Sequence, residues 1–194
     1  MELSIRPLSY LEWPAALALM HRAFVDEPFT VEMYGQEIPS RWARSWALYS
    51  TMQRASYTLA LGARLGDVLV GAIVGSGPGH CHLCQVLARE PRPDDPLDAI
   101  EWQFHQNIFG VHQSLGEHAW IDKVATEKAL RGNGIARRLL DATADALKRQ
   151  APAELVLECA PDRISFYLGL QFTQVSSFAD PAGPDAVLMR RRIV

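Results

Sequence analysis

The sequence predicts a single α/β domain. Apolar runs typical of strands alternate with segments of helical periodicity, and no linker, repeat or low-complexity tract divides the chain. A length of 194 residues fits one domain, and 48% hydrophobic with 21% charged residues is ordinary for a globular protein. One domain is therefore expected to cover residues 1–194.

The N-terminal part is expected to form a strand followed by two helices. Leu3, Ile5 and Leu8 lie near the strand, and Pro14 opens the first helix. Residues 26–29 break that helix, because proline disfavours a helical residue before it, and residues 40–55 form the second helix. The helical spacing of its large aromatic residues predicts a buried stripe, made of Trp42, Trp46 and Tyr49.

The rest of the chain is expected to add six strands and three helices. The strands are predicted at residues 57–64, 68–74, 119–126, 155–159, 172–178 and 187–193, and the helices at residues 99–113, 134–149 and 162–170. The resulting order is β-α-α-β-β-(insert)-β-α-β-α-β-β, with a long insert at roughly residues 75–117. The run Arg190-Arg191-Arg192, flanked by apolar residues, is interpreted as part of an edge strand.

Composition narrows the classes of function. The formal net charge of −3 argues against general nucleic-acid binding, which favours a clustered basic excess. Three cysteines give no disulfide framework, and the N-terminus lacks the pattern of a secretory leader, so we expect a cytoplasmic protein. No apolar stretch approaches the roughly 20 residues that span a bilayer, so no membrane association is expected.

The cluster His80-Cys81-His82-Leu83-Cys84 contains residue types that bind zinc. Structural zinc sites pair two separated ligand couples, and the remaining histidines, His105, His112 and His118, form no second couple. We therefore expect no metal, and we interpret the cluster as a pocket wall or a packed strand.

A glycine-containing loop directly before the strongest helical segment has the properties of a phosphate-binding cradle. Arg131 is followed by Gly132 and Gly134, and helical periodicity begins after them. Glycine lets the backbone approach a ligand closely, and the first turn of a helix leaves backbone N–H groups without helical partners. The helix dipole favours an anion by about 0.3–1 kcal/mol, and Arg131 adds a positive charge. The alternative is an ordinary loop before a helix.

This loop, Arg131-Gly132-Asn133-Gly134-Ile135-Ala136, fits the Q/R-x-x-G-x-G/A pattern of the GNAT superfamily of acyl-CoA-dependent N-acyltransferases, which the chain resembles over nearly its whole length. The resemblance implies a mixed, mostly antiparallel central sheet with helices on both faces. It also implies that the loop amides bind the pyrophosphate of acetyl-CoA. The backbone of Val124, Ala125 and Thr126 on the preceding strand is implied to hold the pantetheine arm.

Acyl transfer to an amine needs a proton acceptor, because on the order of one lysine-like amine in a thousand is neutral at pH 7. Asp122 is one candidate. It lies where GNAT enzymes of the polyamine type place a glutamate, and strand alternation predicts that His118, Trp120 and Asp122 share one face. The alternative for Asp122 is a structural ion pair, and His118 is the next candidate should neither carboxylate serve.

Glu27 is the preferred candidate base. Phe24-Val25-Asp26-Glu27-Pro28-Phe29 resembles the F-x-D-E-P-L segment of insect-type arylalkylamine N-acyltransferases, in which the glutamate is the general base, and Ser177-Phe178-Ala179-Asp180 is similar to their F-A-D ending. Cys159-Ala160-Pro161-Asp162 departs from that family, which has serines there, so the serines' role does not carry over. The alternative is a surface acid in the turn that ends a helix.

Tyr167 is the candidate acid for the leaving thiolate. Residues 162–172, DRISFYLGLQF, resemble the second coenzyme motif of the GNAT superfamily, which ends in Y-x-x-x-G-F and whose tyrosine approaches the thioester sulfur. Gln171 stands where that motif has glycine. The alternative is a tyrosine that only packs.

The sequence as a whole predicts an N-acetyltransferase that moves an acetyl group from acetyl-CoA to a primary amine of a small molecule by direct attack. A protein or peptide N-acetyltransferase and a non-catalytic acyl-CoA-binding module stay open as alternatives. We expect a monomer or a homodimer. The insert at 75–117 either closes the pocket over a small amine or blocks a peptide groove.

Overall fold

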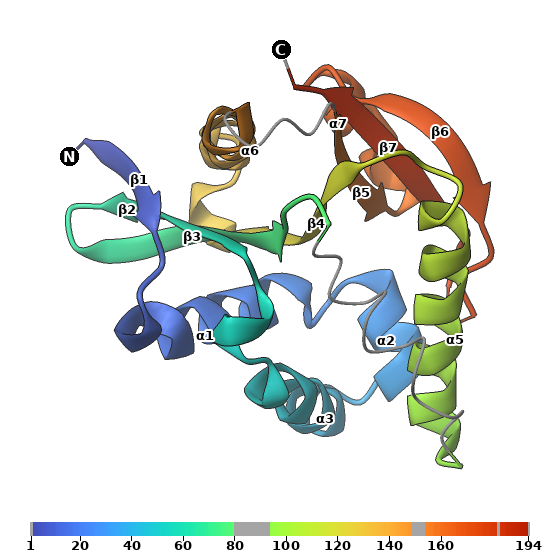
Figure 1. Cartoon of the computed structure of the whole chain (residues 1–194). Coiled ribbons are helices and arrows are strands. Elements are labelled where there is room, and N and C mark those ends of the chain that lie inside the picture. The colour runs from blue at the N-terminus through green and yellow to red at the C-terminus, as the bar shows by residue number, and fades with distance from the viewer. Residues whose placement is uncertain (1, 80–93, 149–153, 182, 194) are drawn as a thin grey trace.

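The computed structural model of the protein describes residues 2–79, 94–148, 154–181 and 183–193, and within them seven strands form one sheet (Figure 1). The strands are β1 (Leu3–Pro7), β2 (Leu59–Leu65), β3 (Val68–Ser76), β4 (His118–Thr126), β5 (Glu154–Cys159), β6 (Thr173–Phe178) and β7 (Ala186–Arg192). The α-helices are α1 (Trp13–Phe24), α2 (Pro28–Tyr34), α3 (Ile38–Thr51), α5 (Pro96–His112), α6 (Ile135–Leu147) and α7 (Ile164–Leu168).

The sheet has the order β1-β2-β3-β4-β5-β7-β6, and β4 and β5 are its parallel pair among antiparallel neighbours. This confirms the mixed, mostly antiparallel sheet. The interpretation of the arginine run as an edge strand is wrong, because β7 lies between β5 and β6. It pairs along one side with β5 and along the other with β6, and its residues Val187, Leu188 and Met189 are buried on both faces.

Apolar residues on both faces of the sheet explain why helices cover both. In β2, Leu59, Leu61 and Ala63 belong to the core cluster that also contains residues of α6 and α7, whereas Ala60 belongs to a second cluster with residues of α1 and α3. This alternation has the period of two that a strand imposes on its side chains. Figure 1 shows α6 on one side of the sheet and α1 and α3 on the other.

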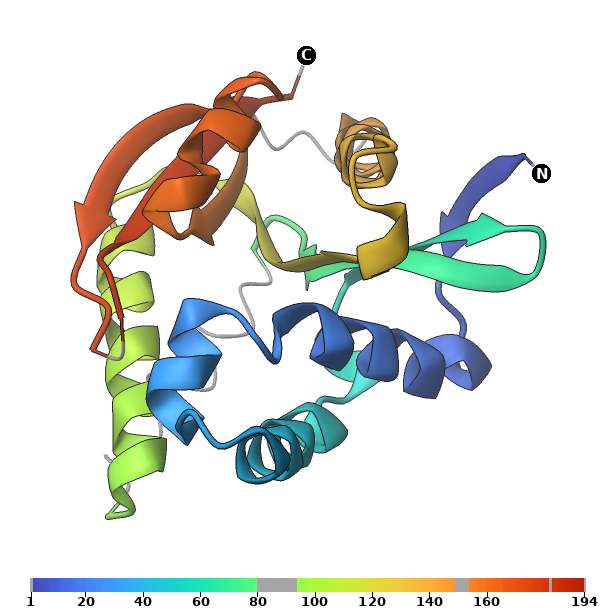
Figure 2. The ribbon, with the colours of Figure 1, turned by 180° about the vertical axis from the view of Figure 1, so that it is seen from behind.

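The central strands β4 and β5 diverge. Their pairing begins at His118 with Glu154 and ends at Ile121 with Leu157. Beyond that point β4 continues beside β3 as far as Thr126, and β5 continues beside β7 as far as Cys159. The register of β3 against β4 also shifts, so that Asp122 is an extra residue in β4, which is a β-bulge. Figure 2 shows the two strands separating as they leave their paired segment.

Two details of the N-terminal helices differ from the sequence prediction. A short helix, α2, follows the break at residues 26–29, and Pro28 occupies its first turn, where a missing N–H is tolerated. The buried stripe on the next helix is wrong for Trp42 and Trp46, which are 44% and 37% exposed. The buried face of α3 contains Arg41, Ser45 and Tyr49, and the two tryptophans lie beside it, edge-on to a buried histidine.

The insert contributes helix α5, close to the predicted helix at 99–113. Its aromatic side chains contact neighbouring elements on two sides: the ring centroid of Phe104 lies 5.0 Å from that of Phe29 on α2 and 6.1 Å from that of Phe178 on β6. The cluster at residues 80–84 lies outside the described residues.

The turn after α7 keeps a left-handed conformation without a glycine. Gln171 has a φ of 66°, and the backbone N–H of Phe172 donates to the carbonyl oxygen of Tyr167 at 3.1 Å. Glycine adopts this conformation freely, whereas a residue with a Cβ is strained by about 1–2 kcal/mol. The GNAT-like turn is therefore present despite the substitution.

We predict that Gln171→Gly raises the free energy of unfolding by about 0.5–1 kcal/mol, because relief of the strain exceeds the entropy that glycine gains in the unfolded chain. Gln174→Gly is the matched control, since Gln174 is an exposed strand residue, and it should lower stability. Urea denaturation of the two variants measures both effects. A loss of stability in Gln171→Gly as large as in the control would contradict the strain.

Candidate functional site

The loop between β4 and α6 forms the expected cradle. Gly132 and Gly134 have φ values of 84° and 73°, and Gly134 is the N-cap of α6. Both positions need the left-handed conformation that glycine adopts without strain. An ideal Cβ at either would meet nothing within 4 Å, because both glycines line an open cavity. The backbone N–H groups in the first turn of α6 therefore lie at the wall of this cavity.

The cavity has a volume of about 750 Å³ and lies where β4 and β5 diverge. One wall contains Val124, Ala125 and Thr126 of β4 together with the cradle. The opposite wall contains the end of β5, helix α7 and the segment before β7. Because β5 no longer pairs with this part of β4, backbone groups of β4 can bind an extended ligand there. The volume is typical of cofactor sites.

Arg131 joins the cradle to α1. Its Nη2 donates to the carbonyl oxygen of Ala23 at 3.2 Å, and both residues line the cavity. Arg137 on α6 likewise donates to the carbonyl oxygen of Gly169 at 2.9 Å and lines the cavity. Two guanidinium groups therefore border the cradle, where they attract an anion.

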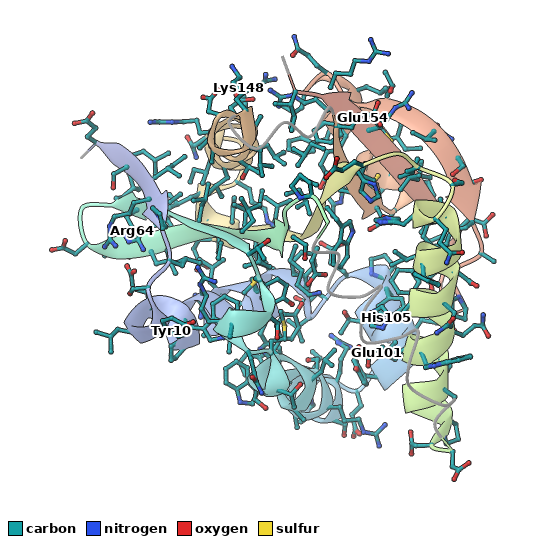
Figure 3. The ribbon with its side chains drawn as sticks, in the orientation of Figure 1. Tyr10, Arg64, Glu101, His105, Lys148 and Glu154 are labelled. Carbon is teal, nitrogen blue, oxygen red and sulfur yellow. The ribbon has the colours of Figure 1, made fainter. Side chains whose placement is uncertain are left out.

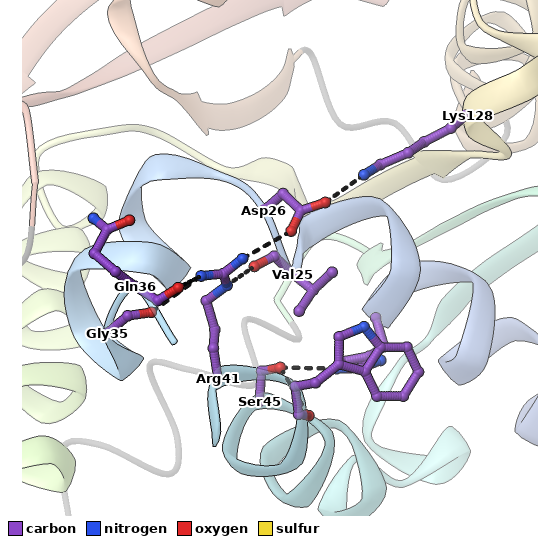
Figure 4. Close-up of polar contacts among 9 residues, drawn as sticks. Val25, Asp26, Gly35, Gln36, Arg41, Ser45 and Lys128 are labelled. Atoms are coloured by element: carbon purple, nitrogen blue, oxygen red, sulfur yellow. Dashed lines mark hydrogen bonds and ion pairs between the residues drawn. The ribbon is translucent and has the colours of Figure 1, made fainter. Parts of the chain in front are cut away.

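An ion-pair network fixes the break between α1 and α2 (Figure 4). Asp26 accepts hydrogen bonds from Lys128 at 2.5 Å and from Arg41 at 3.1 Å, and the Nε of Arg41 also donates to the carbonyl oxygen of Val25 at 2.9 Å. Lys128, and to a lesser extent Arg41, lower the pKa of Asp26 below its ordinary value. Lys128 belongs to the short 3-10 helix that ends at Leu130, directly before the cradle, so the network links the break to the cradle.

Glu27 follows this network directly and lies on the cavity wall. It is the N-cap of α2, and its side chain is 25% exposed. Nη2 of Arg163 lies 3.2 Å from both carboxylate oxygens of Glu27. The candidate base is therefore held by an arginine from the element that precedes α7.

Tyr167 lies in the same cavity as Glu27. Burial raises the pKa of its hydroxyl well above the ordinary value, with a smaller contribution from nearby acidic groups, so the hydroxyl keeps its proton at neutral pH. That is the state a general acid needs. The structure brings the candidate acid and one candidate base into one cavity.

Asp122 lies outside this large cavity. Ala119 and Ile121 pack in the cluster under α6, so Trp120 and Asp122 point to the other face, as strand alternation predicts. There Asp122 accepts hydrogen bonds from Tyr57 and Lys123, each at 2.8 Å. It lines a second cavity of about 70 Å³, which shares four lining residues with the large one.

The surroundings of Asp122 form a charged network. Burial lowers the pKa of Lys123, but the negative charge of Asp122 and further neighbours outweigh it, so the pKa is raised and the lysine stays cationic. His105, on α5, has a pKa lowered to about 4 by burial, with Lys123 adding to the shift. Figure 3 shows His105 beside Glu101 on this helix. Asp122 thus has the partners of a structural ion pair as well as an opening toward the site.

Glu158, which the sequence reasoning missed, lines both cavities at the end of β5. Its side chain is 9% exposed; Oε1 lies 2.5 Å from Nε2 of His112, and Oε2 accepts a hydrogen bond from Nε1 of Trp120 at 2.8 Å. The sequence does contain a signal for it, namely an acidic residue near the end of the apolar strand predicted at residues 155–159. His118 and Trp120 are not among the described residues that line the large cavity, although Trp120 contacts Glu158 and His118 contacts His112.

The end of the large cavity beside α2 and α5 contains aromatic and acidic side chains. Phe29 and Phe104 line it together with Glu27, Glu158 and Asp180. Phe104 comes from α5, so the insert supplies part of the wall. We refer to this end as the acceptor end.

The described residues contain no group of three or more His, Cys, Asp or Glu side chains arranged to hold a metal ion. Among the helices that the structure describes, none combines the length and apolar character required to cross a membrane.

A family model described as an acetyltransferase (GNAT) domain matches residues 100–193, which include the cradle, Glu158 and Tyr167. Residues 100–193 of the chain therefore contain a GNAT domain, which is the domain of acyl-CoA-dependent N-acetyltransferases. The predicted fold and enzyme class are thereby confirmed. No curated protein sequence matches the chain.

Solved structures of GNAT proteins share this fold across the whole chain. The polyamine N-acetyltransferase of Drosophila melanogaster, which forms N-acetylagmatine, has a TM-score of 0.74 at 13% identity and covers 98% of this chain and 100% of its own. A protein of Corynebacterium glutamicum described as histone acetyltransferase HPA2 and related acetyltransferase has a TM-score of 0.68 at 19% identity, with coverages of 100% and 98%. A chain of the NatC complex bound to Gag peptide and CoA has a TM-score of 0.60 at 17% identity and full coverage of both chains.

In this GNAT enzyme, we predict that Gly134→Val weakens acetyl-CoA binding by about 10–100-fold, because losing one hydrogen bond to a charged phosphate costs about 1.5–3 kcal/mol. Gly79→Val is the matched control, since Gly79 has the same φ of 73° and an equally open Cβ position outside the cavity. Isothermal titration of both folded variants measures the difference. Equal affinities in the two variants would refute the cradle.

Tyr167→Phe should lower kcat of the GNAT enzyme by roughly 10²-fold and leave the Kd for coenzyme A nearly unchanged, since a general acid acts in the transition state. The raised pKa of Tyr167 also means that its ionisation does not cause any loss of wild-type rate below about pH 10. Steady-state rates between pH 6 and pH 10 test both points. Wild-type turnover in the variant would assign Tyr167 to packing.

Proposed function

We propose that the enzyme transfers an acetyl group from acetyl-CoA to a primary amine of a small molecule by direct attack in a ternary complex. The observation that carries this proposal is the acceptor end, where α5 adds Phe104 to a wall that also contains Phe29 and three carboxylates. Aromatic faces and carboxylates favour a cationic alkyl or arylalkyl amine. A helix from the insert beside this end favours a small acceptor over an extended peptide.

Each step of the transfer has a candidate group in this chain. The amides from Gly132 to Ala136 would bind the pyrophosphate, and the backbone from Val124 to Thr126 would hold the pantetheine arm. Glu27 would take the amine proton, and Tyr167 would protonate the leaving thiolate. Asp122 has a route to the same amine through the small cavity, since 70 Å³ is enough room for water.

The surroundings of Cys159 disfavour an acyl-enzyme route. Its thiol lines the cavity, but burial and then the negative charge of Glu158 raise its pKa to about 12. The thiolate is the nucleophilic form of cysteine, so this thiol is a poor acceptor of the acetyl group. This supports direct attack by the amine.

The alternative functions are acetylation of a protein or peptide and binding of acyl-CoA without catalysis. A peptide acceptor is supported by the likeness to the NatC chain, whose structure holds a Gag peptide. We favour the small amine because α5 and α2 meet at the acceptor end through Phe104 and Phe29.

A screen of amines and peptides with thiol detection tests the proposal. We expect release of coenzyme A with aryl- or alkylamines above the rate of hydrolysis, and no release with peptides of similar charge. Activity with peptides alone would favour the protein acetyltransferase. If no acceptor releases thiol while coenzyme A still raises the melting temperature, the chain is a binding module.

Glu27→Gln is expected to depress kcat/KM more than Asp122→Asn, with the largest loss at low pH and partial recovery at high pH, where more amine is already neutral. Both changes preserve the shape of the side chain. The expectation rests on the place of Glu27 in the large cavity, whereas Asp122 opens only onto the small one. Rates between pH 6 and pH 9 on a confirmed amine decide the order.

If both variants keep full activity over that range, neither carboxylate is the base. A larger loss in Asp122→Asn, with the fold intact by circular dichroism, would transfer the role to Asp122 acting through water.

A further inference from the structure

Three titratable side chains form a series of contacts that leads from the cavity toward the surface. Glu158 forms the inner end on the wall of both cavities. Its Oε1 lies 2.5 Å from Nε2 of His112, and Nδ1 of His112 lies 3.1 Å from Nε2 of His118. The side chain of His112 is 1% exposed, whereas His118 is half-buried and its Nδ1 lies 2.7 Å from the carbonyl oxygen of Gly116.

The fold explains why these residues meet. His112 ends α5 and His118 begins β4, and the short connection between them brings the two rings within 4.9 Å, centroid to centroid. Glu158 reaches them from β5, which runs parallel to β4 at this point. The chain of contacts therefore crosses from the insert to the central strands of the sheet.

The contacts fix the number of protons that the three groups share. A carbonyl oxygen only accepts, so Nδ1 of His118 carries a hydrogen. If His118 is neutral, its Nε2 accepts from Nδ1 of His112. Nε2 of a neutral His112 would then present a lone pair to the carboxylate of Glu158 at 2.5 Å, which is repulsive. The three groups must therefore hold one proton more than a carboxylate and two neutral imidazoles.

Trp120 fixes the orientation of Glu158 without taking part in proton exchange. Its Nε1 donates to Oε2 at 2.8 Å, and the indole N–H is a donor only. Each carboxylate oxygen has a second lone pair, so Glu158 can accept another proton from the cavity while both hydrogen bonds persist. His112 and Trp120 therefore hold the carboxylate in place, and its remaining lone pairs can still accept a proton from the cavity.

We propose that Glu158, His112 and His118 form a proton relay from the acceptor end to solvent, and this relay rests on the proposed acetylation of an amine. The ammonium group of the acceptor passes a proton to Glu158, directly or after Glu27. The proton shared between Glu158 and His112 then settles on Nε2 of His112, and the proton on Nδ1 of His112 moves to Nε2 of His118. The cationic His118 then loses its Nδ1 proton to solvent, which breaks the hydrogen bond to the carbonyl oxygen of Gly116. The relay ends with as many protons as it began with, and the neutral amine attacks the thioester.

Other charged and titratable groups line the two cavities together with Glu158 and enter the pH dependence of the relay. They are Cys159 on its own strand, Asp162, Arg163 and Tyr167 on the segment that follows, Glu27 on α2, and Asp122 across the small cavity. Arg163 is the cation of this set and it is paired with Glu27. Glu158 therefore has its own counter-charge in the imidazole of His112.

Glu158→Gln separates a relay from a structural role that only holds α5 against the sheet. The amide oxygen of glutamine can accept from Trp120, and its NH₂ can donate to Nε2 of a neutral His112, so every hydrogen bond is satisfied without the extra proton. The fold should persist, but the side chain no longer accepts a proton. We expect kcat/KM for the amine to fall by about 10²-fold at pH 7, with partial recovery at high pH.

Glu154→Gln is the matched control, because Glu154 lies four residues earlier on the same strand, pairs with Arg190 and lines neither cavity (Figure 3). It should keep wild-type kinetics. His118→Ala is the second test, since it removes only the outer member and leaves space for imidazole, which should restore much of the lost rate. Wild-type kcat/KM and pH profile in Glu158→Gln would overturn the relay while leaving the acetyltransferase intact.

Nitrogen-15 NMR of the imidazoles tests the shared proton without any substrate. We expect both ring nitrogens of His112 to be protonated at pH 7 in the wild type, or the carboxyl proton of Glu158 to be seen, and neither in Glu158→Gln. A neutral His112 with the same spectrum in both proteins would overturn the relay. If the wild type acetylates no amine, the proposed function fails and this proton count alone decides whether the three groups are coupled.

Discussion

The functional site depends on one interruption in the backbone hydrogen bonding of the sheet. β4 and β5 pair over four residues and then separate, each continuing with its other neighbour. A sheet that paired throughout would leave no polar backbone for a ligand and no space for a cavity between two central strands. The separation opens the cavity, directs the end of β5 into it and places the cradle at its rim. The cradle, Glu158 and Tyr167 all line the cavity that this gap opens.

Local chemistry made much of this predictable from the sequence. Alternating apolar periodicity predicts the elements because side-chain burial follows the same periods in strands and helices. The cradle is predictable because glycines before a helix have few other uses, and both adopt positive φ. Gln171 shows the limit of motif reading: the motif has glycine there, yet the turn keeps its left-handed geometry, since the hydrogen bonds around it outweigh the strain.

Features that depend on contacts between distant parts of the chain could not be predicted from the sequence. Glu158 and His112 are 46 positions apart, and their contact requires the packing of α5 on the parallel strands. The bulge at Asp122 is a change of register, which leaves no mark on the apolar pattern. The exposure of Trp42 depends on how α3 rotates against α1, because a large aromatic residue at the border of a buried face satisfies the same spacing as one within it.

The position of β7 between β5 and β6 has a mechanical consequence. β6 has one neighbour in the sheet, so it is held there only through β7. The connection between these two strands carries Asp180 and Pro184, which line the acceptor end. Helix α5 is the second support of this part of the wall, because Asn107 donates to the carbonyl oxygen of Ala179 at 2.8 Å and the Phe104 ring lies 6.1 Å from that of Phe178. The wall beside the proposed acceptor therefore depends on the insert helix as well as on β7, whereas the coenzyme cradle is built from β4 and α6 alone.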